Sequence, residues 1–504
     1  MSKLSRNIIY NLLGQGSLLI ISFLAVKYIF HQLGAEALGI IYFTIAMNTI
    51  LAVALEMGVS SALVREISSH FDSDKEYIKK LIHTFSFFYW GIYLVAALII
   101  FFMAPFFVQK WIHLSSISPD LAINIIRILG ITSVTTLLVS FYSSLIRGLQ
   151  KMKFNNLIDV VSGILQQGGA LLILILNGSL MLVIYWFAIS YILKVCIYFL
   201  VSGYLFSFPA LTPKFSSAVI KRNFKFILNT TFISIFSTIH IQADKISISK
   251  FLPISTLGYY SLAYTAVSQA TLLTDSVSMA AYPSFSSLAK EKDKNELMSQ
   301  YYKLQDLLCF GILPIFAAIP FALVPVFSFL FNAQIANLLL LPTTFLCLGI
   351  YMNGTVTIPY VFSLAVGKPN ITAKMNFYAL FIVLPPSVIL IYFFGLPAAG
   401  LYLVFYHIFA YFYSIPKICK ECLGIKVKDW YFHIFRIFIL AILTYGTSWF
   451  ILGVINNHSI FALILAYLLS SVVYLYFSYF LITKELKKTL FYYVQLLLNI
   501  KKSK

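Results

Sequence analysis

The sequence predicts an all-α membrane protein that crosses the bilayer about fourteen times. Three observations predict this class: the composition, the spacing of the apolar segments, and the distribution of lysine and arginine. Hydrophobic residues make up 60% of the 504 residues and charged residues only 11%. A soluble domain is about half apolar and about a quarter charged. A chain with this few charges could not cover a water-facing surface. We therefore expect no soluble domain large enough to hold an active site.

Fourteen apolar segments set the number of crossings. A helix needs about 20 predominantly apolar residues to cross the hydrocarbon of a bilayer. Segments of about that length cover residues 8–30, 40–60, 81–104, 122–146, 158–176, 181–203, 227–250, 257–282, 303–331, 338–365, 374–394, 398–416, 432–455 and 459–482. Turn residues at Asn177-Gly178-Ser179 and Gly395-Leu396-Pro397 predict two tight hairpins. The first segment is too long for the apolar core of a signal peptide and is expected to be retained.

The basic residues predict the orientation. The 36 lysines and arginines lie in short clusters between the apolar segments. With both termini in the cytoplasm, 30 of the 36 fall on the cytoplasmic side, as the positive-inside rule requires. The other six are Lys27, Lys110, Arg127, Lys194, Lys245 and Lys250. Topology therefore explains the net charge of +19, and no nucleic-acid partner is expected.

A weak internal repeat divides the chain. A shift of 219 positions aligns Leu38-Gly39 with Leu257-Gly258, Glu56 with Asp275, Asp74-Lys75 with Asp293-Lys294, and Gly148 with Gly367. The shift pairs crossings one to six with seven to twelve, so both halves have the same orientation and a pseudo-two-fold axis along the membrane normal. We predict two six-helix bundles around a central cavity, in residues 1–219 and 220–430. Residues 431–504 would then hold two extra helices and a basic cytoplasmic tail.

The sequence shows no pattern for covalent chemistry or for a metal site. The five cysteines do not make a disulfide framework. Cys419 and Cys422 form a lone CxxC, and the two further ligands that a zinc site needs are not nearby. A nucleophile paired with a base and a phosphate-binding loop are also lacking. The chain is therefore expected not to be an enzyme and to carry no cofactor.

Short motifs follow one another along residues 1–420. They are Asn7 and Asn11, Leu33 to Ile40, Glu56-Met57-Gly58 with Arg65-Glu66-Ile67, Gln242-Ala243-Asp244-Lys245, Leu257-Gly258-Tyr259-Tyr260, Gly367-Lys368-Pro369, and Gly395 to Gly400. Each motif is diffuse, but their order and spacing agree. In this pattern the chain resembles the polysaccharide flippases of the multidrug/oligosaccharidyl-lipid/polysaccharide exporter superfamily, which include flippases of O-antigen repeat units.

The resemblance implies a function, a location and partners. The family moves polyprenyl-diphosphate-linked oligosaccharides from the cytoplasmic to the outer leaflet by alternating access, during surface polysaccharide biosynthesis. It implies a multi-pass protein of the bacterial cytoplasmic membrane, surrounded by lipids. A polysaccharide polymerase and a chain-length regulator are the candidate protein partners, and H+ or Na+ is the candidate coupling ion.

Three other functions are compatible with a chain of this kind to different degrees. Lipid II flippases of the same superfamily also have fourteen crossings, so that function stays open. A cation-coupled multidrug exporter fits less well, because basic residues predominate in the predicted interior. A membrane-embedded glycosyltransferase or polymerase would need a large outer loop with catalytic acids or arginines, whereas the longest outer loop, residues 105–121, has the single acid Asp120.

A diphosphate head that crosses hydrocarbon needs basic side chains around it. The candidates for a cationic cavity are Arg65, Arg147, Lys194, Lys245, Lys27 and Arg127. Arg65 and Arg147 are expected at the cytoplasmic mouth, where positive-inside topology is the alternative explanation. Lys27 and Arg127 lie near the outer ends of their crossings, where snorkelling of the side chain explains them equally well.

Ionisable and polar residues within the crossings are candidates for ion coupling or for a structural role. Helical spacing predicts polar stripes in the first and seventh crossings, made of Asn7, Asn11, Gln15 and Ser22, and of Thr230, Ser234, Ser237 and Asp244. His240 precedes Asp244 by one turn and can pair with it, whereas Lys245 is adjacent and is expected to point elsewhere. Glu56 and Asp275 are expected near the cytoplasmic ends of equivalent helices, where they would cap charged loops or bind ions.

Overall fold

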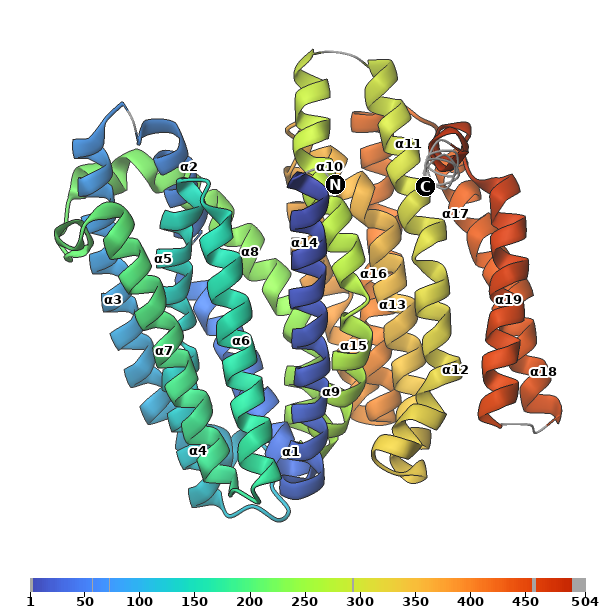
Figure 1. Ribbon diagram of the computed structural model, residues 1–504, viewed down its shortest axis with the longest axis horizontal. Helices are drawn as coiled ribbons and strands as arrows, with labels where there is room; N and C mark the ends of the chain where they lie inside the picture. The colour runs from blue at the N-terminus through green and yellow to red at the C-terminus, as the bar shows by residue number, and fades with distance from the viewer. Residues whose placement is uncertain (1–2, 57, 72, 292–293, 456–458, 492–504) are drawn as a thin grey trace, which may run out of the picture. The chain divides into compact units, whose positions relative to one another are not determined.

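The computed structural model describes residues 3–56, 58–71, 73–291, 294–455 and 459–491; the side chains of residues 3–20 and of some residues between 225 and 291 lie outside this description. The secondary structure of the described part consists of helices and one isolated bridge between His113 and Pro253, joined by turns and loops. The chain divides into two compact units, Met1–Leu262 and Ala263–Lys504. Within each unit the helices run roughly along a common direction (Figure 1). The predicted all-α class is confirmed.

The first unit contains eight helices and the start of a ninth, counted over the described residues. They are α1 (Lys3–Glu56), α2 (Val59–His70), α3 (Lys75–Phe106), α4 (Pro119–Ser133), α5 (Thr136–Gly148), α6 (Met152–Ile175), α7 (Leu180–Phe206), α8 (Ser217–Phe251) and α9 (Ile254–Ser268). A π-helical turn, Phe107–Trp111, extends α3, and a 3-10 turn, Phe208–Leu211, follows α7.

The second unit contains the rest of α9 and the helices that follow it. They are α10 (Thr271–Glu291), α11 (Lys294–Gly311), α12 (Leu313–Leu330), α13 (Ala333–Ala365), α14 (Asn370–Ile382), α15 (Leu384–Phe394), α16 (Leu396–Ile418), α17 (Val427–Ala441), α18 (Thr447–Ile455) and α19 (Ile460–Leu481). Two π-helical turns, Cys419–Leu423 and Ile442–Gly446, lie between α16 and α18.

Each of the fourteen predicted crossings coincides with a helix, part of a helix, or a pair of short helices. Among the described residues, ten helices are long and apolar enough to cross a membrane, and the bent pair α14 and α15 makes an eleventh. The other three predicted crossings fall on the first part of α1, on α8, and on the pair α9 and α10. The protein is therefore a multi-pass membrane protein, and the count of fourteen stays a prediction.

The two predicted hairpin turns are present. Asn177 adopts φ of 57° between α6 and α7, and Gly395 adopts φ of 67° between α15 and α16. Positive φ is accessible to glycine and, among other residues, most readily to asparagine and aspartate, so both turns suit their residues. A third break lies at Gly34, with φ of 84°, which separates the two predicted crossings that α1 joins.

The helix bounds follow the predicted internal repeat. α3 begins at Lys75 and α11 at Lys294, and α6 ends at Ile175 and α15 at Phe394. Members of each pair are 219 positions apart, which is the shift that the sequence comparison gave. The predicted bundle bounds at residues 219 and 430 follow the equivalence of helices in the repeat, whereas the two compact units are defined by contacts. These bundle bounds therefore stay a prediction.

A reciprocal glycine contact supports the two-fold relation. Gly39 of α1 and Gly258 of α9 face each other so closely that a β-carbon on Gly39 would overlap the carbonyl oxygen of Ile254. Conversely, a β-carbon on Gly258 would overlap the carbonyl oxygen of Ala35. Ala35 with Ile254 and Gly39 with Gly258 are both pairs of the 219-residue shift. Such an exchange of equivalent contacts is what a two-fold axis produces.

The apolar core of the first unit lies among α2, α3, α5 and α7. It includes Leu63, Phe85, Phe141, Leu145 and Tyr198, all of which are fully buried. Lipid is as apolar as these side chains, so close packing rather than removal from water holds the helices together. This packing fixes the ends of α2 and α5, on which the polar side chains described below are placed.

In the second unit, Asp306 joins the last helices to α11. Asp306 is 1% exposed. Its Oδ1 lies 2.7 Å from Nε2 of His433 on α17, and its Oδ2 accepts a hydrogen bond from the backbone N of Thr483 at 2.6 Å. The hydroxyl of Tyr474 on α19 also donates to the carbonyl of Phe310 at 3.1 Å. The helices predicted to lie outside the repeat are therefore fastened to α11 by buried polar contacts.

Candidate functional site

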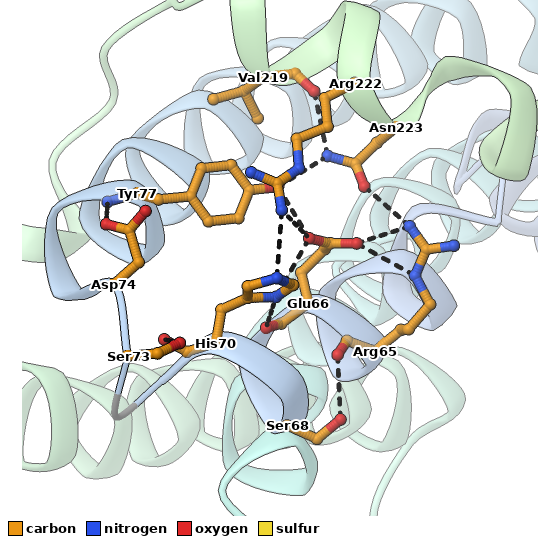
Figure 2. A network of polar contacts seen from close by, with 10 residues as sticks. All are labelled: Arg65, Glu66, Ser68, His70, Ser73, Asp74, Tyr77, Val219, Arg222 and Asn223. Atoms are coloured by element: carbon orange, nitrogen blue, oxygen red, sulfur yellow. Dashed lines mark hydrogen bonds and ion pairs between the residues drawn. The ribbon is translucent and has the colours of Figure 1, made fainter.

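A cluster of polar side chains joins three helices at one end of the first unit (Figure 2). It is called here the Glu66 cluster, and its members are Arg65, Glu66 and His70 of α2, Tyr77 of α3, and Arg222 and Asn223 of α8. Asp74 caps α3 by accepting a hydrogen bond from the backbone N of Tyr77 at 2.9 Å. The cap fixes the first turn of α3 and with it the direction of the Tyr77 side chain.

Glu66 lies at the centre of the cluster and is 4% exposed. Arg65 donates to its Oε1 from Nε at 3.1 Å and from Nη2 at 2.6 Å, and the hydroxyl of Tyr77 donates to Oε2 at 3.0 Å. Asn223 accepts from Arg65 at 3.2 Å and donates to the Tyr77 hydroxyl at 3.2 Å and to the carbonyl of Val219 at 3.0 Å. The carboxylate of α2 is thus linked directly to α3 and, through Asn223, to α8.

Arg222 completes the cluster from the solvent side. Its guanidinium carbon lies 4.0 Å from the centroid of the Tyr77 ring, and its Nη2 lies 3.6 Å from Oε2 of Glu66. The same Nη2 lies 3.2 Å from Nε2 of His70. Since arginine can only donate, this contact assigns the proton of a neutral His70 to Nδ1, which faces the carbonyl of Glu66 at 3.2 Å.

The surroundings of Glu66 favour its charged form. Burial by itself would raise the pKa of this carboxyl group. The hydrogen bonds from Arg65 and Tyr77 and the charges of Arg65 and Arg222 act in the opposite direction and outweigh it, so the pKa lies below the ordinary value of 4.5. Glu66 is therefore a buried carboxylate, stabilised by two arginines.

A second polar region of the first unit has a different character. It is called here the Arg147 region and contains Glu56, Tyr89, Ser140 and Arg147. Arg147, in the last turn of α5, is half-buried, and its Nε is buried without a hydrogen-bond partner among the described residues. The buried hydroxyl of Tyr89 also makes no hydrogen bond of good distance and angle there, although Ser140 lies close to it and Glu56 and Arg147 lie within electrostatic range.

In the described part of the chain, Glu56 of this region is hydrogen-bonded to a serine and not to Arg147. Ser140, on the same helix as Arg147, donates from its hydroxyl to Oε1 of Glu56 at 3.0 Å. No hydrogen bond or ion pair between Glu56 and Arg147 is found among the described residues. Buried donors without a partner are costly unless water or a ligand satisfies them. The Arg147 region therefore holds two buried donors that a water molecule or an anionic ligand would satisfy.

Lys194, predicted to be a lining residue of the cavity, is paired with an acid. Its Nζ on α7 lies 2.9 Å from Oδ1 of Asp159 on α6. The hydroxyl of Tyr198 donates to the same oxygen at 3.0 Å. Because Asp159 compensates its charge, Lys194 adds less positive potential than the sequence count implies.

Asp244 and Lys245 correct one expectation. Asp244 is 1% exposed and accepts a hydrogen bond from the hydroxyl of Tyr260 on α9 at 2.5 Å. Lys245 was expected to point away from Asp244, but its Nζ lies 3.6 Å from Oδ1 of Asp244 and 3.2 Å from the carbonyl of Ile241. That expectation was wrong, because the four-carbon stem of lysine is long enough to fold back along its own helix.

The polar stripe of the seventh crossing is buried in part. His240 is buried on α8, and its pairing with Asp244 stays a prediction. Ser234 and Ser237 are half-buried. The side chain of Thr230 lies outside the described residues, as do those of Asn7, Asn11 and Gln15 in the first crossing.

The other predicted residues have varied surroundings. Arg127 on α4 donates from Nε to the carbonyl of Phe101 at 3.2 Å and covers the ring of Phe101 at 4.3 Å. Lys27 is half-buried on α1. Asp275 on α10 is exposed, whereas Glu56 is half-buried. The environments of this predicted pair therefore differ, and their equivalence stays a prediction.

Sequence reasoning missed the role of five residues in the Glu66 cluster: Glu66, His70, Tyr77, Arg222 and Asn223. Arg65-Glu66 was part of a motif, but adjacent residues on a helix point in different directions and did not suggest a pair. Arg222 lies far from Glu66 in the sequence, and nothing local to either residue indicates the contact. The signal that was available is Asp74, which predicts a helix start and so places Tyr77 one turn inside the membrane-facing helix.

The chain is similar to known proteins in sequence. A sequence profile of a family described as polysaccharide biosynthesis protein matches residues 4–289, more than half of the chain. A Shigella flexneri protein named as an O-antigen transporter is 21% identical over 374 residues, which cover 74% of this chain and 87% of that protein.

Solved structures share the fold. The lipid II flippase MurJ in an inward closed conformation matches with a TM-score of 0.70 and 16% identity, over 93% of this chain and 98% of that one. An inward-facing multidrug resistance MATE family transporter of the MOP superfamily matches with a TM-score of 0.66 and 14% identity, over 82% of this chain and 96% of that one. The profile match confirms the predicted polysaccharide family, the solved structures show the fold, and these relatives are named as transporters and flippases rather than enzymes.

Proposed function

Because the chain belongs to the polysaccharide biosynthesis protein family, we propose that it is a flippase for a polyprenyl-diphosphate-linked oligosaccharide. It moves this lipid from the cytoplasmic to the outer leaflet during surface polysaccharide biosynthesis. The name of the Shigella flexneri relative, an O-antigen transporter, supports this substrate class. The proposal further assigns the protein to the bacterial cytoplasmic membrane, with a polysaccharide polymerase and a chain-length regulator as partners.

The observation that carries this function is the unpaired guanidinium of Arg147. Its Nε is buried and has no hydrogen-bond partner among the described residues, whereas Arg65, Lys194 and Lys245 each have an acid within 3.6 Å. A cation kept in the interior without an ion pair to an acid favours an anionic ligand. A guanidinium group presents a planar fork of donors that matches the oxygens of a phosphate group. We therefore assign the diphosphate to Arg147, with the hydroxyl of Tyr89 as a further donor.

The physical problem of transport concerns the head of the lipid and not its tail. The polyprenyl tail can remain in hydrocarbon, but a sugar diphosphate cannot cross about 30 Å of it unaided. The protein shelters the head among polar side chains while the tail stays in the bilayer. Alternating access of the two repeats then exposes the head first to one side and then to the other. No covalent bond changes in this cycle.

A coupling ion, H+ or Na+, is part of the proposal. Asp244 is the first candidate for binding it, because this carboxylate is buried, and hydrogen-bonded to Tyr260 at 2.5 Å. Glu56 is the second, because it lies in the Arg147 region and would sense the arrival of a diphosphate there. An export assay with an imposed proton gradient or an imposed sodium gradient separates the two ions.

The proposed topology places both termini in the cytoplasm. Its test uses single cysteines at exposed positions in a background without the five native cysteines. Lys79→Cys and Lys484→Cys should be protected from an impermeant thiol reagent in intact cells, and Asp120→Cys should be labelled. Labelling of the first two with protection of the third would reverse the orientation.

The test of function is export in cells that lack their own repeat-unit flippase. The wild-type chain should restore surface polysaccharide, and Arg147→Gln should reduce it at least about tenfold, because one charge-assisted hydrogen bond has about this effect. Lipid-linked repeat units should accumulate on the cytoplasmic side while the amount of protein in the membrane stays normal. Arg147→Lys, which keeps the charge but not the fork, should show an intermediate level.

The same strains separate the alternatives. If the chain rescues cells depleted of their lipid II flippase and does not restore surface polysaccharide, the substrate is the peptidoglycan precursor. If it lowers sensitivity to cationic drugs and does neither of these, the function is multidrug export. Either result would replace the proposed substrate, and unchanged surface polysaccharide in Arg147→Gln would remove Arg147 from the site.

A further inference from the structure

Arg222 is both exposed and fixed in position, a combination that is costly for a surface arginine. Its side chain is 48% exposed. The guanidinium carbon lies 4.0 Å from the centroid of the Tyr77 ring, and Nη2 lies 3.2 Å from Nε2 of His70. Ordering a long exposed side chain costs rotamer entropy, and an exposed ion pair returns little of it. The fixed position therefore suggests a role other than stability.

The charges in the Glu66 cluster do not balance. One carboxylate, Glu66, faces two guanidinium groups, and Arg65 is the closer partner at 2.6 Å. Arg222 lies at 3.6 Å from the same carboxylate, so its charge is in excess. The described contacts of Arg222 are made by Nη2 and by the face of the guanidinium. Its Nε and Nη1 make no hydrogen bond to any described residue, so part of the fork is open to solvent.

The location fits the first contact with a substrate. The distribution of lysine and arginine assigns this end of α2, α3 and α8 to the cytoplasmic side, where a lipid-linked repeat unit would be made. Because Glu66 is buried beneath the two arginines, an anion that approaches from solvent meets guanidinium groups before it meets the carboxylate. A phosphate group can accept hydrogen bonds from the open donors of an arginine fork.

We propose that Arg222 binds a phosphate group of the diphosphate lipid at the cytoplasmic face, before the head reaches the Arg147 region. Glu66 and Tyr77 are positioning residues that hold the guanidinium of Arg222 for this contact. The proposal rests on the proposed function, because it takes the diphosphate lipid as the substrate. It adds a first binding site, apart from Arg147, to the path of the head.

The two explanations of the cluster predict opposite effects of Glu66→Gln. If general attraction of anions governs binding, the loss of a negative charge should strengthen it. If the position of Arg222 governs binding, the loss of the carboxylate should weaken it, although the net charge becomes more positive. The sign of the change therefore separates positioning from simple electrostatics.

The experiment uses the full-length protein in nanodiscs of phosphatidylcholine, with farnesyl diphosphate as the probe. Arg222→Gln should weaken binding about tenfold, as the loss of one charge-assisted hydrogen bond does. Lys221→Gln is the matched control, because it removes the same charge from the adjacent exposed position and should change binding less than about twofold. Arg222→Lys should recover part of the loss, and Glu66→Gln should weaken binding about threefold.

Melting temperatures of all variants, measured in the same nanodiscs, separate binding from folding. If Glu66→Gln is unfolded, Arg222→Gln, Arg222→Lys and Lys221→Gln still decide the proposal. Equal binding of farnesyl diphosphate by Arg222→Gln and Lys221→Gln overturns the proposed role of Arg222. If Arg147→Gln, measured in the same way, weakens binding, the proposed function stands even so. If the wild-type protein does not bind farnesyl diphosphate, both the proposed function and this inference fail.

Discussion

The Glu66 cluster and the Arg147 region both hold charged groups inside the first unit, but their hydrogen bonding differs. Both carboxylate oxygens of Glu66 accept hydrogen bonds, from Arg65 and from Tyr77. In the Arg147 region, Nε of Arg147 and the hydroxyl of Tyr89 have no partner among the described residues. A satisfied buried cluster fixes helices in place, whereas an unsatisfied one needs water or a ligand. The first region therefore stabilises the unit and positions Arg222, whereas the second contains buried donors that are suited to binding.

Substitution of Glu66 and substitution of Arg147 should differ most in their effect on the free energy of unfolding. Glu66→Gln should lower the free energy of unfolding by about 2 kcal/mol, because it removes the acceptor of a charge-assisted hydrogen bond and leaves two arginines without their acid. Arg147→Gln should change it by less than about 0.5 kcal/mol, since no described partner is lost. Thermal unfolding in detergent, at equal protein concentration, measures the difference. Equal destabilisation by both substitutions would contradict the comparison.

Acid should weaken the Glu66 cluster. The pKa of Glu66 lies below its ordinary value of 4.5, so the folded state favours the charged form. Its stabilisation is complete above the pKa of the unfolded chain and is lost as the pH falls through the pKa of the folded protein. The difference in melting temperature between the wild type and Glu66→Gln should therefore narrow as the pH falls from above 4.5 to below the pKa of Glu66 in the folded protein. A constant difference over this range would mean that Glu66 does not titrate there.

Lys194 and Asp159 should show the smallest effect. Their ion pair at 2.9 Å is half-exposed at Asp159, so the coupling between Lys194→Gln and Asp159→Asn should be about 0.5 kcal/mol. Export by the double variant should exceed that of Lys194→Gln, because the single variant leaves an uncompensated acid beside the path of an anion. If the double variant exports less, Lys194 binds the head itself and belongs with Arg147.

The fold could be predicted from the sequence because its determinants are local. The bilayer requires about 20 apolar residues for each crossing, so hydropathy marks each helix without reference to its neighbours. Gly395 and Asn177 mark turns for the same reason, because positive φ is a property of one residue. The 219-residue shift also needed only the sequence, and the exchange of contacts between Gly39 and Gly258 now gives it a structural basis.

The candidate site could be predicted in residue type but not in pairing. Arg147 was among the predicted cations, and the structure distinguishes it because its Nε is buried without a hydrogen-bond partner among the described residues. Lys194 and Lys245 were predicted on equal terms, and both have a nearby acid. Helical geometry alone suggested that Lys245 points away from Asp244, but a flexible stem can reach a neighbour that the helix axis does not place beside it. Counting charges therefore overstated the free positive charge of the interior.

The sequence by itself determined the class of protein, the positions of the crossings and the predicted orientation. These depend on how single segments partition between water and lipid, and each segment carries that information in its own residues. Only the tertiary structure decided which charges are compensated. Asn223 accepts a hydrogen bond from Arg65 across 158 positions of sequence. Arg222, which precedes Asn223 on α8, reaches the carboxylate of Glu66. Such contacts depend on how α2, α3 and α8 pack, and no single segment contains that information.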